Sequence, residues 1–256
     1  MDFKWFAPKN GLIGHRGLAG MAPENTLISF QTAEKHGLNW VEFDVQLSKD
    51  HQLVIFHDHF INRTTNGRGS LYDFTASELD TLDAGSWYDP KFKGVKVPIL
   101  DKDLNEILKC NLHYNIELKC PNNPSELYGQ LLTQKFTEVV LNRWPKNKPL
   151  PLVSSFEWEL LFTLRKTLPD LPIGFLCDVL TPDLLRIAAY TPNCAIHSNY
   201  KHITSTEMNR LKTLNIPVLA YTVNDLQTAN ELLNQGVYAV FTDSLTQTAP
   251  NFRIAS

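Results

Sequence analysis

The chain has no feature that would anchor it in a membrane, export it or draw it to nucleic acid. Nowhere among its 256 residues is there an uninterrupted apolar run of about 18 residues, so we expect no membrane span. The first residues lack the basic region and apolar run of a signal peptide. The formal net charge is −3 and the pI is near 6.2, which gives no overall attraction to nucleic acid or anionic lipid. We therefore expect a cytoplasmic protein with no membrane insertion and no nucleic-acid partner.

Cysteine is scarce, and glycine forms no familiar phosphate-binding motif. The chain has four cysteines and no CxxC pair, so we interpret them as scattered reduced thiols: Cys110, Cys120, Cys177 and Cys194. No glycine-rich dinucleotide motif and no Walker motif follows any apolar run. This absence disfavours a doubly wound open sheet, which is the alternative fold for a chain that alternates strands with helices.

The chain does contain a regular alternation of strand and helix patterns. Eight units of this kind close into a TIM barrel, in which a ring of parallel strands is surrounded by helices. The alternation breaks once, between Asp58 and Leu100, over a stretch too long for a simple connector. We predict one domain spanning residues 1–256, with a small inserted subdomain at about residues 58–100, after the second strand. The predicted strands lie around Ile13, Glu42, Glu117, Val153, Phe175, Ile196, Tyr221 and Val240.

The second predicted strand, residues 41–47, carries the strongest signal for function. Its apolar side chains alternate with Glu42, Asp44 and Gln46, so the polar groups share one face. An amphipathic edge strand would show the same pattern with its polar face in water. In a parallel barrel, however, both faces of a strand are covered, so a carboxylate must be paired, bind a cation or lie at the open rim. We therefore place these carboxylates at the mouth of the barrel, where active sites of this fold occur.

A third carboxylate, Glu117, occupies a similar position on a later strand. Two unit charges 4 Å apart repel by about 4 kcal/mol at an effective dielectric constant of about 20, so three clustered carboxylates need compensation. A hard divalent cation provides it, and Mg²⁺ and Ca²⁺ both prefer carboxylate oxygens. Zinc fits this ligand set less well, because it usually takes nitrogen or sulfur. The alternative is that Arg16 and Lys119 neutralise the carboxylates through salt bridges.

Cations and histidines also fall near the predicted strand ends. Arg16 and Lys119 could cradle a phosphate beside a divalent cation, through a planar fork and a point charge. His15 and His57, on separate loops, could donate and accept protons around phosphorus, although a single histidine is more often structural than catalytic. Together these residues indicate phosphoryl transfer chemistry. The residues expected at the rim are His15, Glu42, Asp44, His57, Glu117, Lys119, His197 and Tyr221.

The order of short motifs along nearly the whole chain resembles the glycerophosphodiester phosphodiesterase family, in its cytosolic bacterial form. Singly these motifs mean little, but in this order and spacing they are specific. They are GHRG (14–17), PENTL (23–27), EFDVQLSKD (42–50), HD (57–58), RTTNGRG (63–69), DAGSWY (83–88), IELK (116–119), SSF (154–156), YTVN (221–224) and FTD (241–243).

The resemblance implies a metal-dependent enzyme that hydrolyses glycerophosphodiesters to sn-glycerol 3-phosphate and an alcohol. It places one divalent cation, Mg²⁺ or Ca²⁺, on the three carboxylates already named, and the acid/base roles on His15 and His57. It assigns phosphate contact to Arg16 and Lys119, and an aromatic wall to Tyr221, where the family often has tryptophan. A tyrosine hydroxyl at this position would alter contacts with the glycerol.

Two other functions are compatible with the same residues. A related metal-dependent phospholipase or lyase would act on lipid headgroups, but it would need a basic or apolar docking surface that the sequence does not show. A non-catalytic barrel that binds phosphate esters would have no need of paired histidines. The sequence leaves open the choice of metal, the oligomeric state, the roles of the two histidines, and whether water or the glycerol 2-hydroxyl attacks first. It also leaves open the preferred alcohol, which we expect the insertion to select.

Overall fold

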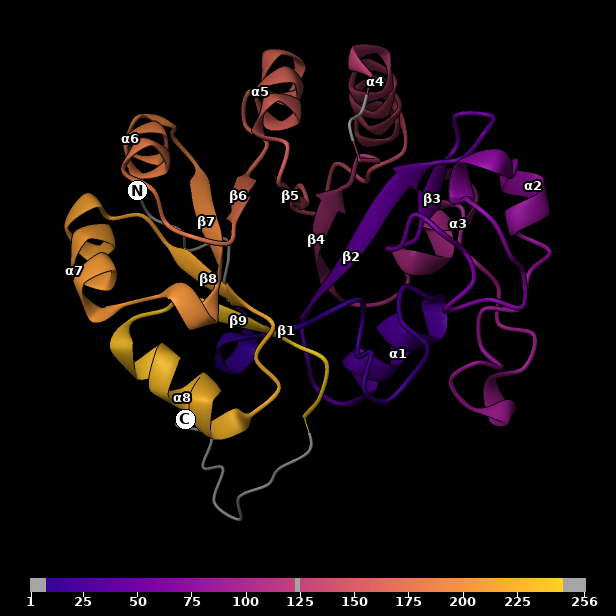
Figure 1. The fold of residues 1–256 in the computed structure, drawn as a ribbon, viewed down its shortest axis with the longest axis horizontal. Helices are drawn as coiled ribbons and strands as arrows, with labels where there is room; N and C mark the ends of the chain where they lie inside the picture. The colour runs from indigo at the N-terminus through magenta and orange to yellow at the C-terminus, as the bar shows by residue number, and fades with distance from the viewer. Residues whose placement is uncertain (1–7, 123–124, 246–256) are drawn as a thin grey trace.

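A closed ring of parallel strands forms the centre of the molecule. The structure, a computed structural model, describes residues 8–122 and 125–245, and within them eight parallel strands surround one axis (Figure 1). The ring closes because β1 pairs with both β2 and β9. The prediction of a TIM barrel is therefore confirmed. The eight strands are β1 (Leu12–Gly14), β2 (Trp40–Leu47), β4 (His113–Leu118), β5 (Leu152–Ser155), β6 (Ile173–Cys177), β7 (Cys194–Asn199), β8 (Val218–Tyr221) and β9 (Ala239–Thr242).

One additional strand, β3 (Leu53–Ile55), lies outside the ring. It runs antiparallel to the end of β2, with Val45 opposite Ile55. The turn between them is held by Ser48, whose backbone N–H donates to the Gln52 carbonyl. The alternation of strand and helix patterns does not count β3, because no helix follows it directly. Its effect is to return the chain to the end of β2, next to the carboxylates.

Helices cover the outside of the ring, and several of them begin at a capping side chain. Thr26, Thr181, Thr204 and Asp225 each accept a hydrogen bond from a backbone N–H in the first helical turn. Among the described helices, none combines the length and apolar composition that a membrane span would require. The helices are α1 (Leu27–Lys35), α2 (Ala76–Leu79), α3 (Leu100–Ile107), α4 (Glu126–Asn142), α5 (Trp158–Thr167), α6 (Pro182–Tyr190), α7 (Ser205–Leu214) and α8 (Leu226–Gln235), with short 3-10 turns at Lys9–Gly11, Leu71–Asp73, Pro90–Phe92 and Tyr200–His202.

The interior of the ring is apolar at its base and polar above it. A buried cluster that includes Ile13, Trp40, Leu152, Ala195 and Leu219 fills the base. Because alternate residues of a strand share a face, the interior residue two positions further along each strand lies one level higher. On β2, β5 and β7 these next residues are Glu42, Ser154 and His197. The pattern places a polar layer between the apolar base and the open end.

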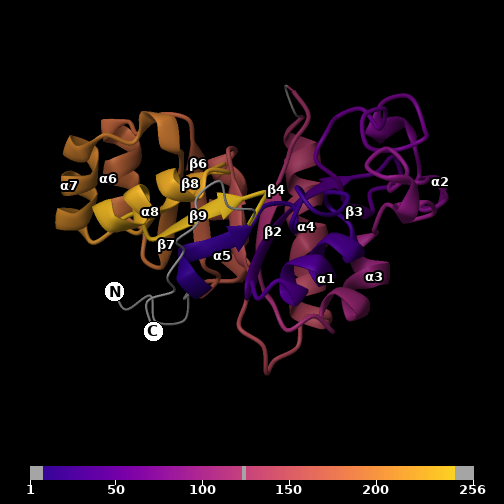
Figure 2. The ribbon, with the colours of Figure 1, turned by 90° about the horizontal axis from the view of Figure 1, so that it is seen from below.

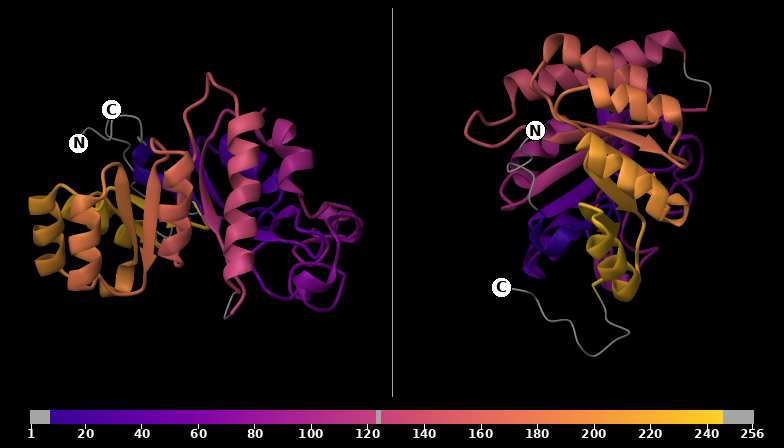
Figure 3. Two further views of the ribbon diagram at one scale, coloured as in Figure 1. Left: turned by 90° about the horizontal axis from the view of Figure 1, so that it is seen from above. Right: turned by 90° about the vertical axis from the view of Figure 1, so that its left-hand side faces the viewer.

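The chain between β3 and α3 forms a compact lobe at one side of the barrel. Figures 2 and 3 show this lobe, which contains α2, on the opposite side of the molecule from α6 and α7, with the long helix α4 between it and α5. Its interior is a separate buried cluster that includes Ile61, Leu71, Leu79, Val97 and Ile99. The interpretation of the chain as a single domain with an inserted subdomain at about residues 58–100 stays a prediction.

Candidate active site

A pocket of about 160 Å³ opens at the end of the barrel where the parallel strands finish. Strands β1 to β9, or the residues directly after them, contribute to its lining. The family resemblance assigns a role to eight residues, and seven of them border the pocket: His15, Arg16, Glu42, His57, Glu117, Lys119 and Tyr221. The eighth, Asp44, lies immediately beside it in a cluster with Glu42 and Glu117. The structure therefore brings together all the residues that the sequence singled out.

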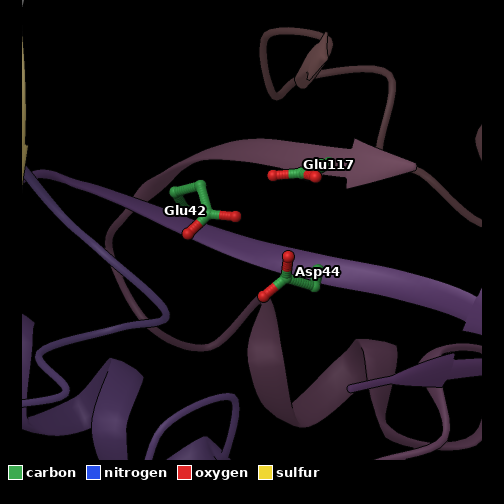
Figure 4. Close-up of side chains that lie close together, drawn as sticks. All are labelled: Glu42, Asp44 and Glu117. Carbon is green, nitrogen blue, oxygen red and sulfur yellow. The ribbon is translucent and has the colours of Figure 1, made fainter. Parts of the chain in front are cut away.

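The three carboxylates converge because of the pairing register between β2 and β4. Asp44 lies directly opposite Glu117, and Glu42 precedes Asp44 by two residues on the same face. Figure 4 shows their carboxylates pointing toward one another, and each offers an oxygen within 4.8 Å of the others. Burial, followed by the charges of Asp44 and Glu117, raises the pKa of Glu42 well above its usual value. Burial also raises the pKa of Glu117.

This cluster has the composition of a site for a hard cation. Its ligands are carboxylate oxygens, which Mg²⁺ and Ca²⁺ prefer. Oε1 of Glu42 is buried and has no hydrogen-bond partner among residues 8–122 and 125–245. A buried, unpaired carboxylate oxygen is costly, and a bound cation would remove that cost. The three carboxylates could therefore hold a divalent cation.

Two cations lie against the same carboxylates. The Lys119 ammonium is 3.1 Å from Glu117 and 3.6 Å from Asp44, and the guanidinium of Arg16 is 3.5 Å from Asp44. Burial alone would raise the pKa of Asp44, but the charges of Lys119, His57 and Arg16 hold it below its usual value. The salt bridges considered as an alternative to a metal are thus present. Three carboxylates against two cations still leave one negative charge, and Arg16 shares its own charge with Glu24 at 2.7 Å.

Each candidate histidine is held by a carboxylate through the ring nitrogen Nδ1. In the first pair, His15 lies 2.6 Å from Asp243, and in the second, His57 lies 2.7 Å from Asp58. An ionised carboxylate can only accept, so Nδ1 carries the proton in both pairs. This leaves both Nε2 atoms available, and that of His15 is 4.0 Å from Glu42. The two aspartates belong to the FTD and HD motifs, but no role had been predicted for either.

Gln46 is a further residue whose role the sequence did not reveal. Its side chain is fully buried, and its amide nitrogen donates to the backbone carbonyls of Phe56, His57 and Asp58 at 2.9, 2.8 and 3.3 Å. Its amide oxygen accepts a hydrogen bond from the hydroxyl of Tyr72 at 2.5 Å. Gln46 therefore attaches the backbone of the His57 loop to β2. Its place on the polar face of the strand was the only available signal.

A chain of charged groups connects the site to the lobe. Arg63, from that lobe, donates to both carboxylate oxygens of Glu24 at 2.7 Å and to Asp58 at 2.6 and 3.0 Å. Glu24 also accepts from Arg16, so it connects both arginines. The PENTL and RTTNGRG motifs thus place the supports of Arg16 and His57. Within the described residues, the lobe beyond His57 contributes nothing to the pocket lining, and selection of the alcohol by the insertion stays a prediction.

Aromatic side chains form one wall of the pocket. The ring of Tyr221 meets that of Phe156 edge-on, with the ring centroids 6.2 Å apart. The hydroxyl of Tyr221 donates to the carbonyl of Cys177 at 2.9 Å and lies 3.3 Å from Asp178. The hydroxyl proton of Tyr221 is therefore already engaged in a hydrogen bond within the protein, which leaves the face of the ring to contact a ligand. Phe156 is 46% exposed and extends this wall towards solvent.

The placement of His197 at the rim needs correction. Its side chain is fully buried, one level above Ala195 in the interior of the ring, although it still borders the pocket. The sequence position near a strand end was right, but β7 continues two residues further, to Asn199. His197 is therefore part of the pocket floor and not of its mouth.

Comparison with known proteins gives consistent matches over nearly the whole chain. The model of the glycerophosphoryl diester phosphodiesterase family matches residues 15–247. The Bacillus subtilis protein YhdW, to which this activity is provisionally assigned, is 37% identical over 244 residues, 91% of this chain and 93% of the relative. A glycerophosphodiester phosphodiesterase of Caldanaerobacter subterraneus is 32% identical over 244 residues, 92% and 94% of the two chains.

Solved structures give the same result. A phosphodiesterase of Oleispira antarctica, determined in complex with the product sn-glycerol-3-phosphate, is 34% identical to this chain. It superposes with a TM-score of 0.84 over 91% of this chain and 92% of its own. Together with the family model and the sequence relatives, this likeness shows that the chain belongs to the glycerophosphodiester phosphodiesterase family.

Proposed function

We propose that this enzyme hydrolyses glycerophosphodiesters to sn-glycerol 3-phosphate and an alcohol, with a divalent cation on Glu42, Asp44 and Glu117 and acid/base catalysis by His15 and His57. The observation that carries the proposal is the pairing of each histidine with its own aspartate beside one cluster of three carboxylates. The product bound by the Oleispira antarctica relative supports the same choice of product. We also propose that the enzyme is located in the cytoplasm.

The positive charge that binds the phosphate would come from two side chains and from a divalent cation held by the carboxylates. Arg16 and Lys119 bind phosphoryl oxygens and stabilise the charge that develops there in the transition state. When bound, a divalent cation, Mg²⁺ or Ca²⁺, supplies further positive charge to those oxygens. Burial tends to lower the pKa of Lys119, but the charges of Asp44 and Glu117 raise it above its usual value, so this ammonium stays charged at neutral pH.

The two imidazoles move the protons. With Nδ1 donating to a carboxylate, each Nε2 can accept a proton or, once protonated, donate one. One histidine takes the proton of the attacking hydroxyl, and the other protonates the departing alcohol. The aspartates fix the orientation of each ring and stabilise its protonated form. The wall formed by Phe156 and Tyr221 gives the alcohol an apolar contact with little hydrogen bonding, which agrees with tolerance of several alcohols.

Release of glycerol 3-phosphate from glycerophosphocholine tests the proposal directly. We expect His15→Ala and His57→Ala each to lower kcat by about 10²-fold or more, the scale of general acid–base catalysis. EDTA should remove most of the activity of the unmodified enzyme. His202→Ala, a change of an exposed histidine, is the control and should retain full turnover. Near-normal turnover in either site variant, with folding verified by circular dichroism, would exclude that histidine from the acid/base role.

A further inference from the structure

A group of buried polar side chains lies inside the ring at the level of Glu42, below Asp44 and Glu117. His197 on β7, Asn115 on β4 and Ser154 on β5 are at most 1% exposed, yet all three border the pocket. We call these three residues the polar floor. Asn115 lies directly opposite Glu42 in the pairing of β2 with β4, so the floor adjoins the lowest of the three carboxylates. The proposed acid/base and phosphate-binding roles involve none of its members.

Packing fixes the position of His197 in this floor. Strand β7 lies diametrically across the ring from β2, so the imidazole faces the carboxylates from the opposite wall. Gly174 on β6 provides the room, because a Cβ at that position would collide with the imidazole. The ring of Phe241 packs on His197 with the centroids 5.2 Å apart. A glycine and an aromatic ring thus hold an imidazole within the barrel.

The polar atoms of the floor are incompletely paired. Neither ring nitrogen of His197 has a hydrogen-bond partner in the part of the chain that the structure describes, and the same is true of Oδ1 of Asn115. Nδ2 of Asn115 donates to the Ser154 hydroxyl at 3.0 Å. Leaving such groups unsatisfied costs free energy, so buried polar groups normally have a partner. The available atoms are two acceptors and one donor, since a neutral imidazole supplies one of each.

The chemistry of these atoms suits a hydroxyl group and not a phosphate. Burial lowers the pKa of His197 to about 3, so the ring is neutral at physiological pH and brings no positive charge. A hydroxyl can donate to one acceptor and accept from one N–H at the same time. Asn115 lies two residues below Glu117, which is about 6.6 Å along a strand. That distance is comparable to the length of a three-carbon polyol whose phosphate lies at the carboxylate cluster.

We propose that His197 and Asn115 form a subsite that hydrogen-bonds the terminal hydroxyl of the glycerol half of the substrate. This inference rests on the proposed function, because it needs the phosphate to lie beside Glu42, Asp44 and Glu117. The subsite makes the enzyme selective for the glycerol half, while the aromatic wall accommodates the variable alcohol. Selectivity arises because a diester without this hydroxyl leaves the polar atoms of the floor unpaired.

The experiment compares two substrates that differ by one oxygen atom. Glycerophosphocholine carries both glycerol hydroxyls, and the propane-1,2-diol analogue lacks only the terminal one while keeping the 2-hydroxyl. We expect the unmodified enzyme to prefer glycerophosphocholine by about 10²-fold or more in kcat/KM. His197→Phe and Asn115→Leu should lower kcat/KM for glycerophosphocholine by a similar factor. Both should change kcat/KM for the analogue by less than about threefold, so that the preference largely disappears.

A control variant and the pattern of outcomes test the subsite separately from the proposed hydrolysis. His113→Phe changes a half-buried histidine at the opposite end of β4 and should keep the normal preference. If the unmodified enzyme releases no glycerol 3-phosphate, the proposed function itself is wrong. If it does so without distinguishing the two substrates, the subsite alone is overturned, whether or not the variants fold. Equal losses on both substrates in folded variants would show a purely structural floor and would also overturn it.

Discussion

At the scale of single residues, the carboxylate behind each histidine determines what the imidazole can do. Asp58 follows His57 directly in the sequence, whereas Asp243 is 228 residues from His15 and receives a second hydrogen bond, from Asn224 at 2.7 Å. Both aspartates accept from Nδ1, so both rings present Nε2 to the pocket. A change that removes the negative charge but keeps the size of the side chain tests this arrangement.

Asp243→Asn is expected to lower kcat by about 10²-fold, because an amide can donate to Nδ1 and so favour the wrong tautomer of His15. KM should change much less, since the Asp243 carboxylate is hydrogen-bonded to His15 and Asn224 and, among the described residues, to neither Arg16 nor Lys119. Steady-state release of glycerol 3-phosphate measures both constants. Asp183→Asn removes an exposed aspartate from α6 and provides the matched control. A loss confined to KM would contradict the orienting role.

The same variant should alter the pH dependence of stability. Burial alone would raise the pKa of Asp243, but the hydrogen bond and charge of His15 and the hydrogen bond from Asn224 lower it. A lowered pKa means that the carboxylate stabilises the fold above its unfolded pKa of about 3.9, and that this contribution disappears as the pH falls through the folded value. The Tm difference between the unmodified protein and Asp243→Asn should therefore be largest at neutral pH and shrink below about pH 4.

At the scale of elements, β2 both carries two of the three clustered carboxylates and holds the loop that carries His57. Gln46→Met keeps the approximate length of the side chain but removes the donors to three consecutive carbonyls. We expect kcat to fall by about tenfold or more, because small displacements of a catalytic group are costly. Gln134→Met, on the exposed face of α4, is the control. Turnover within twofold of normal in a folded Gln46→Met protein would show that the loop keeps its position without this side chain.

Elements were predictable from sequence wherever a local pattern determines them. The strict alternation in residues 41–47 identified β2 and the face that carries its carboxylates. Strand β3 was not counted among the predicted strands, because a three-residue return strand has no periodicity of its own. The role of Gln46 was not predicted for a different reason. Its partners are backbone carbonyls, which look the same in every sequence.

At the scale of the whole molecule, closure of the ring creates the contacts that no local pattern could show. Pairing of β9 with β1 brings Asp243 to His15, and the position of β7 opposite β2 brings His197 across the ring from Glu42. The gathering of Glu42, Asp44 and Glu117 was predictable because the fold itself was recognisable and because strand ends meet at one rim. Which further residues would support that cluster depended on the register of the complete barrel.

The three carboxylates meet only in the folded barrel, so a metal ion should bind the folded state. Thermal unfolding can detect this binding without any substrate. Glu117 lies far from Glu42 and Asp44 in the sequence, so the unfolded chain has no preformed site, and a divalent cation should bind mainly to the folded state. Such binding adds about 2.7 kcal/mol at a cation concentration one hundred times Kd. The Tm of protein freed of metal with EDTA should therefore rise as Mg²⁺ or Ca²⁺ is added, and the more effective ion identifies the preferred one.

Glu117→Gln removes one proposed ligand and should abolish most of this rise. Because burial raises the pKa of Glu117, ionising this carboxylate opposes folding, and the variant should unfold in EDTA at a temperature no lower than that of the unmodified protein. Glu126→Gln, on the exposed start of α4, should retain the full metal-dependent rise. An equal rise in the two variants would place the ion elsewhere on the protein, because a site built on three carboxylates cannot lose one of them without losing affinity.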